Sequence, residues 1–271
     1  MANKPREALY KRRRDAWMQV LADPAERIGD NIVQARLDLL ETWRADPWAY
    51  LSGKDTDGRP IIWTADERDD VVPVKPFPAD KSYLQDMTAE LWAYRIVLTD
   101  KVRQMYVTTL CCLNIDWYCS FTEEREVFVS RVKQESAEKL IEDKIRAVHR
   151  RKPLWLQHAC PLSMSPMHKA VYEATGSSVT AVGQNFADSE GRGPTGSLVL
   201  VDEAAFQENF RGIYRAIQPY QTRIWAISTA NIGNDGAALF KELIHEGRPG
   251  FVDPEEAEET PDEDEEEVES L

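Results

Sequence analysis

The sequence has no long apolar run, few cysteines and few histidines, and each shortage excludes a class of protein. No stretch approaches the roughly 18 apolar residues that a membrane-spanning helix needs, so we expect no membrane protein. The amino-terminal region has no apolar segment with a cleavage site, so we expect no export and a cytoplasmic location. None of the four cysteines (Cys111, Cys112, Cys119 and Cys160) forms a CxxC pair or lies near a histidine at zinc-ligand spacing, which predicts reduced, mostly buried thiols and no structural metal.

Basic residues are missing from the end of the chain. The net charge of the 271 residues is -14, but residues 253–271 contain 12 acidic side chains and no basic one. The rest of the chain holds 35 acidic and 33 basic residues and is therefore close to neutral. Because the acidic segment has almost nothing apolar to bury, we expect residues 251–271 to be a disordered tail or linker.

The pattern of apolar residues predicts the fold class. Residues 6–48 have helical spacing and suggest a helical segment over residues 1–45, whereas prolines make residues 47–78 loop-like and forbid a long helix there. A main domain follows over residues 46–250. Five apolar runs predict strands, over residues 94–99, 126–130, 178–183, 197–202 and 223–229, and residues 134–151 predict a helix. Apolar strands that alternate with helices indicate a mostly parallel sheet covered on both faces, hence an α/β three-layer sandwich.

The segment LVLVDEAAF, residues 198–206, is the strongest local signal for chemistry. An apolar strand there delivers Asp202 and Glu203 to the edge where open α/β sheets bind ligands. Such a pair suits ATP hydrolysis, because the first carboxylate can hold Mg²⁺ and the second can orient and deprotonate the attacking water. The alternative is a buried strand that happens to end in an acidic helix start.

Two further loops follow predicted strands. The strand of residues 223–229 ends near Ser228, Thr229 and Asn231. If this strand neighbours the one bearing Asp202, these three residues would lie near a terminal phosphate. The alternative is an ordinary exit from a strand into a loop. The loop after residue 99 contains no GxxxxGK[ST] motif and no glycine. It supplies positive charge from Lys101 and Arg103, and Thr108 or Thr109 in a first helical turn could ligate Mg²⁺; the alternative is a plain helix start.

The order of these segments resembles the large terminases of tailed phages, in which the lysine of the Walker A loop lies at the front, in motifs such as KSRQMxxTW. Residues 101–109 read KVRQMYVTT, with Val102 in place of a small residue and Thr109 in place of tryptophan. The matching residues are Lys101, Arg103, Gln104, Met105 and Thr108. The likeness extends to DPWAYL (46–51), KPFP (75–78), VSRVKQESAEKLIEDKIR (129–146), ADSEGRGPTGSLVLVDEAAF (187–206) and ISTAN (227–231), and so covers roughly residues 46–250.

The resemblance implies a P-loop NTPase of the additional-strand, catalytic-glutamate type. It assigns nucleotide binding to Lys101, Arg103, Gln104, Met105, Thr108 and Asp202. Of these, Thr108 and Asp202 would hold Mg²⁺. Glu203 would be the catalytic base, and Ser228, Thr229 and Asn231 would couple hydrolysis to movement. Arg103 could reach the γ-phosphate within its own subunit. Arg192, in a glycine-rich loop, would serve as an arginine finger for a neighbouring subunit or is a solvated loop charge.

The implied activity is Mg²⁺-dependent ATP hydrolysis that drives double-stranded viral DNA into a procapsid. The implied partners are DNA bound without sequence preference, a portal protein, a small terminase subunit and further copies of the chain in a ring on the procapsid. Large terminases continue into a nuclease domain, which we do not expect here, because the acidic run of residues 255–269 lacks apolar strands. The alternatives are a helicase-like translocase and a nucleotide-binding assembly scaffold without turnover.

Overall fold

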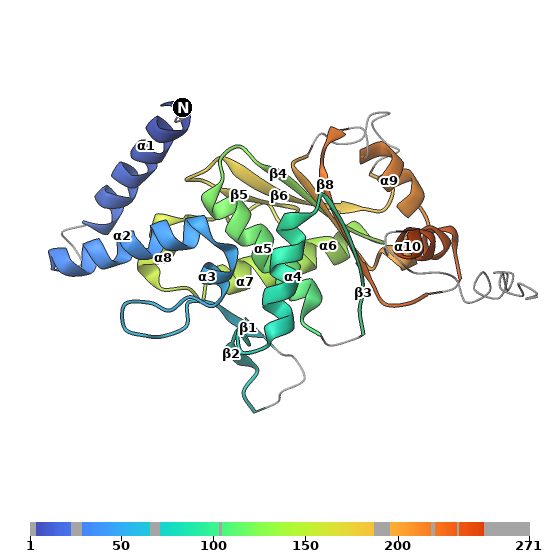
Figure 1. Cartoon of the computed structure of the whole chain (residues 1–271), viewed down its shortest axis with the longest axis horizontal. Helices are drawn as coiled ribbons and strands as arrows, with labels where there is room; N and C mark the ends of the chain where they lie inside the picture. Colours follow the sequence, from blue (N-terminus) through green and yellow to red (C-terminus); the bar gives the residue numbers. More distant parts are fainter. Residues whose placement is uncertain are drawn as a thin grey trace, which may run out of the picture.

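The structure is a computed structural model, and a mostly parallel sheet forms its centre (Figure 1). It describes residues 4–22, 29–65, 71–102, 105–186, 196–217, 220–231 and 233–246. Within these residues no helix is both long and apolar enough to cross a membrane.

The main sheet has six strands in the order β3-β8-β7-β4-β6-β5. The strands are β3 (Ile96–Asp100), β4 (Glu126–Arg131), β5 (Lys169–Tyr172), β6 (Ser177–Gly183), β7 (Leu198–Asp202) and β8 (Arg223–Ser228). All neighbouring strands are parallel except β5, which runs antiparallel to β6. Strand β8 is inserted between β3 and β7, so the predicted sheet with an additional strand is confirmed.

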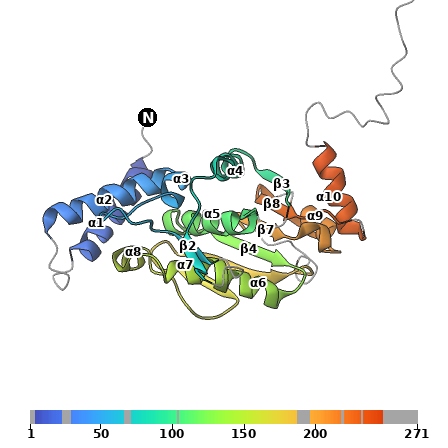
Figure 2. The same ribbon diagram turned by 90° about the horizontal axis from the view of Figure 1, so that it is seen from below.

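Helices lie on both faces of this sheet and beyond its edges (Figures 1 and 2). They are α1 (Lys4–Leu21), α2 (Asp30–Ala45), α3 (Pro47–Leu51), α4 (Ser82–Ala93), α5 (Val107–Phe121), α6 (Gln134–Ile141), the π-helical turn η2 (Glu142–Arg146), α7 (Ala147–His149), α8 (Leu154–Ala159), the 3-10 turn η3 (Ala204–Phe206), α9 (Phe210–Ile217) and α10 (Asp235–Glu246). A separate two-stranded antiparallel sheet joins β1 (Trp63–Ala65) to β2 (Val74–Pro76).

Alternate residues of the central strands face two different hydrophobic cores, as the period of a strand requires. Leu198 and Leu200 of β7 belong to the core that includes α5 and α6. Val199 and Val201 of the same strand belong to the core formed with α9 and α10. The strand is therefore buried on both faces, and the three-layer sandwich predicted from its unbroken apolar run is confirmed.

The amino-terminal helices share a core with the rest of the chain. Trp17 of α1 and Leu37 and Leu40 of α2 are buried in the same cluster as α5. Helix α3 begins at Pro47, a position where proline's missing N–H costs nothing, and Asp46 accepts a hydrogen bond from the Trp48 amide. The region expected as a loop thus starts with one short helix. The division into residues 1–45, 46–250 and 251–271 stays a prediction, and residues 251–271 lie outside the described part of the chain.

All five strands expected from the sequence are present, within two residues at each end. Strand β5 was not predicted, because only four residues form it and it lies at the edge of the sheet, where a strand has no long apolar run. The helix predicted over residues 134–151 is confirmed in part: its middle widens into the π turn η2. All four cysteines are free and buried, as predicted.

A buried ion pair ties together elements that lie far apart in the sequence. Asp116 of α5 and Lys152 are joined by a 2.7 Å contact, and each side chain is 1% exposed. The hydroxyl groups of Tyr50 and Tyr172 also donate to the Asp116 carboxylate, at 2.8 and 3.0 Å. A buried charge is stable only when it is paired and hydrogen-bonded, and here both conditions hold.

His149 lies near this pair and gives a testable pH dependence. Burial, together with the positive charge of Lys152, lowers the pKa of His149 to about 4, from an ordinary value of 6.5. In the unfolded chain His149 takes up a proton below pH 6.5, whereas in the folded chain it stays neutral down to about pH 4. Its contribution to stability is therefore complete above pH 6.5 and is lost as the pH falls toward 4.

We expect a fall from pH 7.5 to 5 to reduce the free energy of unfolding by about 2 kcal/mol through His149 alone. The measurement is urea unfolding at both pH values for the wild type, His149→Gln and His158→Gln, the last being an exposed control. His149→Gln should show a smaller loss on acidification than the other two proteins. Equal losses in all three would show that the buried imidazole does not titrate as described.

Candidate functional site

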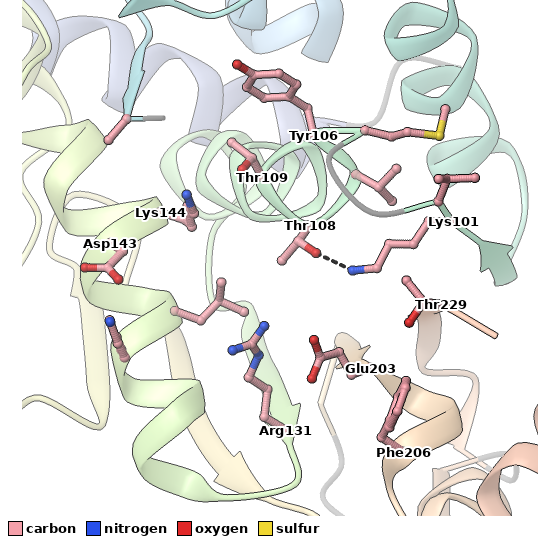
Figure 3. Close-up of a pocket in the computed structure, with 16 residues that line it drawn as sticks. Lys101, Tyr106, Thr108, Thr109, Arg131, Asp143, Lys144, Glu203, Phe206 and Thr229 are labelled. Atoms are coloured by element: carbon pink, nitrogen blue, oxygen red, sulfur yellow. Dashed lines mark hydrogen bonds between the residues drawn. The ribbon is translucent and has the colours of Figure 1, made fainter. Parts of the chain in front are cut away.

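A cavity of about 670 Å³ lies at the carboxyl ends of the central strands (Figure 3). Its lining comes from the last residues of β1 and β4, from the segments that follow β3, β7 and β8, from the start of α5 and from α6 and η2. The lining residues are Ala65, Lys101, Val102, Met105, Tyr106, Val107, Thr108, Thr109, Arg131, Lys139, Leu140, Asp143, Lys144, Glu203, Phe206 and Thr229. This is the edge where open α/β sheets bind ligands.

Three predicted site residues meet on one side of the cavity. The Lys101 ammonium donates to the Thr108 hydroxyl at 2.7 Å and to Asp202 Oδ1 at 3.2 Å. The Thr108 hydroxyl in turn donates to Asp202 Oδ1 at 3.0 Å. Asp202 is fully buried, whereas the Lys101 side chain is 12% exposed and reaches the cavity. Residues that lie about 100 positions apart in sequence thus form one hydrogen-bonded cluster.

The start of α5 is suited to bind an anion. Tyr106, which precedes the helix, has φ 57 and ψ 4, a left-handed conformation, and no described side chain caps the first turn. Val107, Thr108 and Thr109 of that turn line the cavity. Uncapped amides at a helix N-terminus carry partial positive charge, so they attract phosphate groups. The left-handed residue supplies the turn that glycine supplies in other phosphate-binding loops.

Glu203 directly follows the buried Asp202 yet is exposed and lines the cavity. Its backbone has φ 58 and ψ 45, a left-handed conformation that costs a residue other than glycine about 1–2 kcal/mol. This conformation ends the extended strand at once. Asp202 is therefore fully buried, while the Glu203 side chain points into the cavity (Figure 3).

The end of β8 contacts both of these segments. The Lys101 amide donates to the Ser228 carbonyl oxygen at 2.8 Å, while the Ser228 hydroxyl accepts from the Ala205 amide at 3.2 Å. The Asn231 side-chain amide donates to the Ala205 carbonyl oxygen at 2.8 Å. Thr229 lines the cavity. The segment predicted to couple hydrolysis to movement is therefore hydrogen-bonded to the turn that follows Glu203.

Arg131 at the end of β4 belongs to the site, although the sequence analysis gave it no role. Its Nε and one terminal nitrogen donate to Asp202 Oδ2 at 2.8 and 2.5 Å. Burial alone would lower the pKa of Arg131, but the Asp202 carboxylate outweighs burial and the pKa is raised. The sequence shows only that Arg131 follows an apolar strand, as Asp202 does, and not that the two strands are neighbours. Figure 3 shows Arg131 and Glu203 pointing toward each other.

The π turn adds further positive charge to the cavity wall. Residues five apart in an α-helix point about 140° away from each other, yet Lys139 and Lys144 both line the cavity. The wider turn η2 begins at Glu142, contains Lys144 and realigns the helix. Arg146 anchors this turn by donating to the carbonyl oxygens of Pro166 and Lys169, at 2.6 and 2.8 Å.

The charges and donor atoms of the cavity suit a metal-bound polyphosphate. Four basic side chains line it, from Lys101, Arg131, Lys139 and Lys144, against two acidic ones, from Asp143 and Glu203. The Thr108 hydroxyl oxygen and Asp202 Oδ1 lie 3.0 Å apart. Hydroxyl and carboxylate oxygens are the ligands that Mg²⁺ prefers, so the residues present fit this ion.

The structure thus brings most of the predicted site residues together. Those that line the cavity are Lys101, Met105, Thr108, Glu203 and Thr229, and those directly behind it are Asp202, Ser228 and Asn231. Arg103, Gln104 and Arg192 lie outside the described residues. Their roles, like the roles of the residues brought together, stay predictions.

A close backbone contact behind Glu203 gives another prediction. A Cβ at Gly236 of α10 would overlap the Gln207 carbonyl oxygen, at the end of the turn that follows Glu203. We expect Gly236→Ala to lower the free energy of unfolding by about 1–3 kcal/mol, because backbone has to shift. Gly233→Ala is the matched control, since a Cβ there meets its nearest atom at 3.7 Å. Equal urea midpoints for the two variants would contradict the close contact.

Comparison with known proteins identifies the fold. No protein-family model matches the chain, and no curated protein matches its sequence. Among solved structures, the large terminase of bacteriophage HK97 matches with a TM-score of 0.50 and 15% identity, over 67% of this chain and 40% of that one. The large terminase ATPase domain of Thermus phage P74-26 has a TM-score of 0.48 and 16% identity, over 62% of this chain and 71% of that domain. The match thus spans less than half of the HK97 protein. The chain shares the fold of that protein, which is a large terminase, and large terminases are the family that the motifs of this chain resemble.

Proposed function

We propose that this chain is an ATPase that uses Mg²⁺ and drives double-stranded DNA into a viral procapsid. The observation that carries the proposal is the cluster of Lys101, Thr108 and Asp202 beside Glu203, at the edge of a sheet with the fold of a large terminase. A lysine, a hydroxyl and two successive carboxylates are what phosphoryl transfer to water requires, namely a phosphate clamp, metal ligands and a base.

Each residue has a distinct task in this proposal. Lys101 and the first amides of α5 bind the β- and γ-phosphates of ATP. Thr108 and Asp202 hold Mg²⁺, which when bound neutralises phosphate charge. Glu203 hydrogen-bonds the attacking water on the γ-phosphate side and accepts its proton. Loss of the γ-phosphate alters the surroundings of Glu203, and the hydrogen bonds of Ala205 to Ser228 and Asn231 pass that change to the end of β8.

The proposal of DNA and of the other partners rests on the resemblance to large terminases. The near-neutral body of the chain is compatible with phosphate contacts to DNA that carry no sequence preference and weaken steeply with salt. We propose that copies of the chain form a ring on the portal, with a small terminase subunit as a further partner. In that ring Arg192 would reach the ATP site of the adjacent copy.

Phosphate release from ATP tests the proposal. The wild-type chain with Mg²⁺ should release phosphate above a protein-free control, and more so when double-stranded DNA and portal are added. No release under any of these conditions, with nucleotide bound, would favour the assembly scaffold without turnover. Release that DNA stimulates while the chain binds neither portal nor small terminase would favour the helicase-like translocase.

A further inference from the structure

Asp202 is surrounded by positive charge on both sides of its carboxylate. Lys101 and Thr108 contact Oδ1, and Arg131 contacts Oδ2 through two nitrogens. Asp202 is fully buried, so these contacts take the place of water. One negative charge thus has two cationic partners, and the carboxylate offers no free oxygen to a third cation.

The backbone around this ion pair is fixed. The side chain of Gln207 is fully buried; it accepts from the Ser130 hydroxyl at 2.9 Å and donates to the Asp202 carbonyl oxygen at 2.9 Å. It thereby joins the ends of β4 and β7. The guanidinium of Arg131, in contrast, belongs to a side chain that is 27% exposed and lines the cavity. Any change in the pairing of Arg131 with Asp202 is therefore a side-chain rotation and not a movement of the strands.

We infer that Arg131 is the counter-ion that closes the metal position while no nucleotide is bound, and that it leaves Asp202 when a metal-bound nucleoside triphosphate enters. This inference rests on the proposed function. A triphosphate gives the guanidinium several anionic oxygens within the same cavity, and guanidinium groups bind phosphate with two parallel hydrogen bonds. Lys101 is drawn to the same phosphates, so both cations leave Asp202 together.

The consequence is an order of binding. A free divalent cation that approaches Asp202 meets the charges of Lys101 and Arg131 and has no free carboxylate oxygen to bind. The same cation bound to a triphosphate arrives together with an anion, and that anion draws Lys101 and Arg131 away from Asp202. Arg131 therefore makes Asp202 a weak ligand for free metal ions and a good one for the metal–nucleotide complex. Arg131 is thus a positioning residue that acts through Asp202.

The test measures the affinity for free Mn²⁺, an electron-spin probe for Mg²⁺ sites, without nucleotide. Arg131→Gln removes the charge that blocks Asp202, so we expect it to bind Mn²⁺ about tenfold or more tightly than the wild type. Arg131→Lys keeps the charge and should remain close to wild type. Arg211→Gln is the matched control, because Arg211 also pairs with a carboxylate, that of Glu242, at 3.2 Å, and neither residue lines the cavity.

Two additional proteins define the outcome. Adding Asp202→Asn to Arg131→Gln should abolish the gain in Mn²⁺ affinity, which shows that the gain arises at Asp202. Arg131→Ala replaces Arg131→Gln if the glutamine variant does not fold, as judged by its thermal midpoint. Mn²⁺ affinity equal to wild type in a folded Arg131→Gln or Arg131→Ala would overturn the inference. A failure of the proposed function would be recognised by a different result, namely that the wild-type chain binds no fluorescent ATP analogue.

Discussion

Replacing Glu203 with glutamine should leave ATP bound and abolish most of its hydrolysis. The amide has the shape of the carboxylate but cannot accept a proton from the attacking water. Removal of a positioned base lowers turnover by about 10²- to 10⁴-fold, and we expect a loss in this range. Because Glu203 is exposed and its side chain does not cap the turn that follows it, we expect the fold to be unchanged.

The measurement is phosphate release at saturating ATP and Mg²⁺, together with a titration of a fluorescent ATP analogue. Glu242→Gln is the matched control, since Glu242 is half-exposed on α10 and pairs with Arg211. Its turnover should equal that of the wild type. If Glu203→Gln released phosphate at the wild-type rate, Glu203 would not be the base.

Replacing Lys101 with alanine should instead weaken nucleotide binding itself. The ammonium group lies 2.7 Å from the Thr108 hydroxyl, at the start of α5, where the phosphates of ATP would bind. Loss of a hydrogen bond to a charged group costs about 1.5–3 kcal/mol, which corresponds to a roughly 10- to 150-fold higher dissociation constant. Asp202 retains its pairing with Arg131 in this variant, so the buried carboxylate keeps a counter-ion.

The titration with a fluorescent ATP analogue distinguishes this effect from a loss of turnover. Lys241→Ala on the exposed face of α10 is the control and should bind like the wild type. A thermal midpoint close to wild type would exclude unfolding of Lys101→Ala. Identical dissociation constants for Lys101→Ala and the wild type would make Lys101 a surface charge without a phosphate contact.

The fold could be predicted from the sequence because burial on two faces leaves a clear pattern. Strand β7 is buried at every position and is apolar from Leu198 to Val201, and only a sheet covered on both faces requires this. The order of the strands was not available from the pattern. It depends on contacts between distant segments, such as the pairing of β3 with β8.

The part of the site that the sequence analysis missed depends on register and on local helix geometry. The parallel pairing of Ser130 with Val201 places the next residues, Arg131 and Asp202, side by side, and no spacing within either segment reveals this register. The sequence predicted one helix over residues 134–151, and an unbroken α-helix would point Lys144 about 140° away from Lys139. The π turn changes that direction, and a widened turn leaves no periodicity that a single sequence displays.

The most direct test of the central claim is a crystal structure of the chain with Mg²⁺ and a non-hydrolysable ATP analogue. We expect the triphosphate to occupy the cavity, within hydrogen-bonding distance of Lys101 and the first amides of α5, with Glu203 facing the terminal phosphate. We also expect Asp202 and Thr108 to lie beside the metal ion. A triphosphate bound at another surface, or a cavity that stays empty at saturating analogue, would contradict the account.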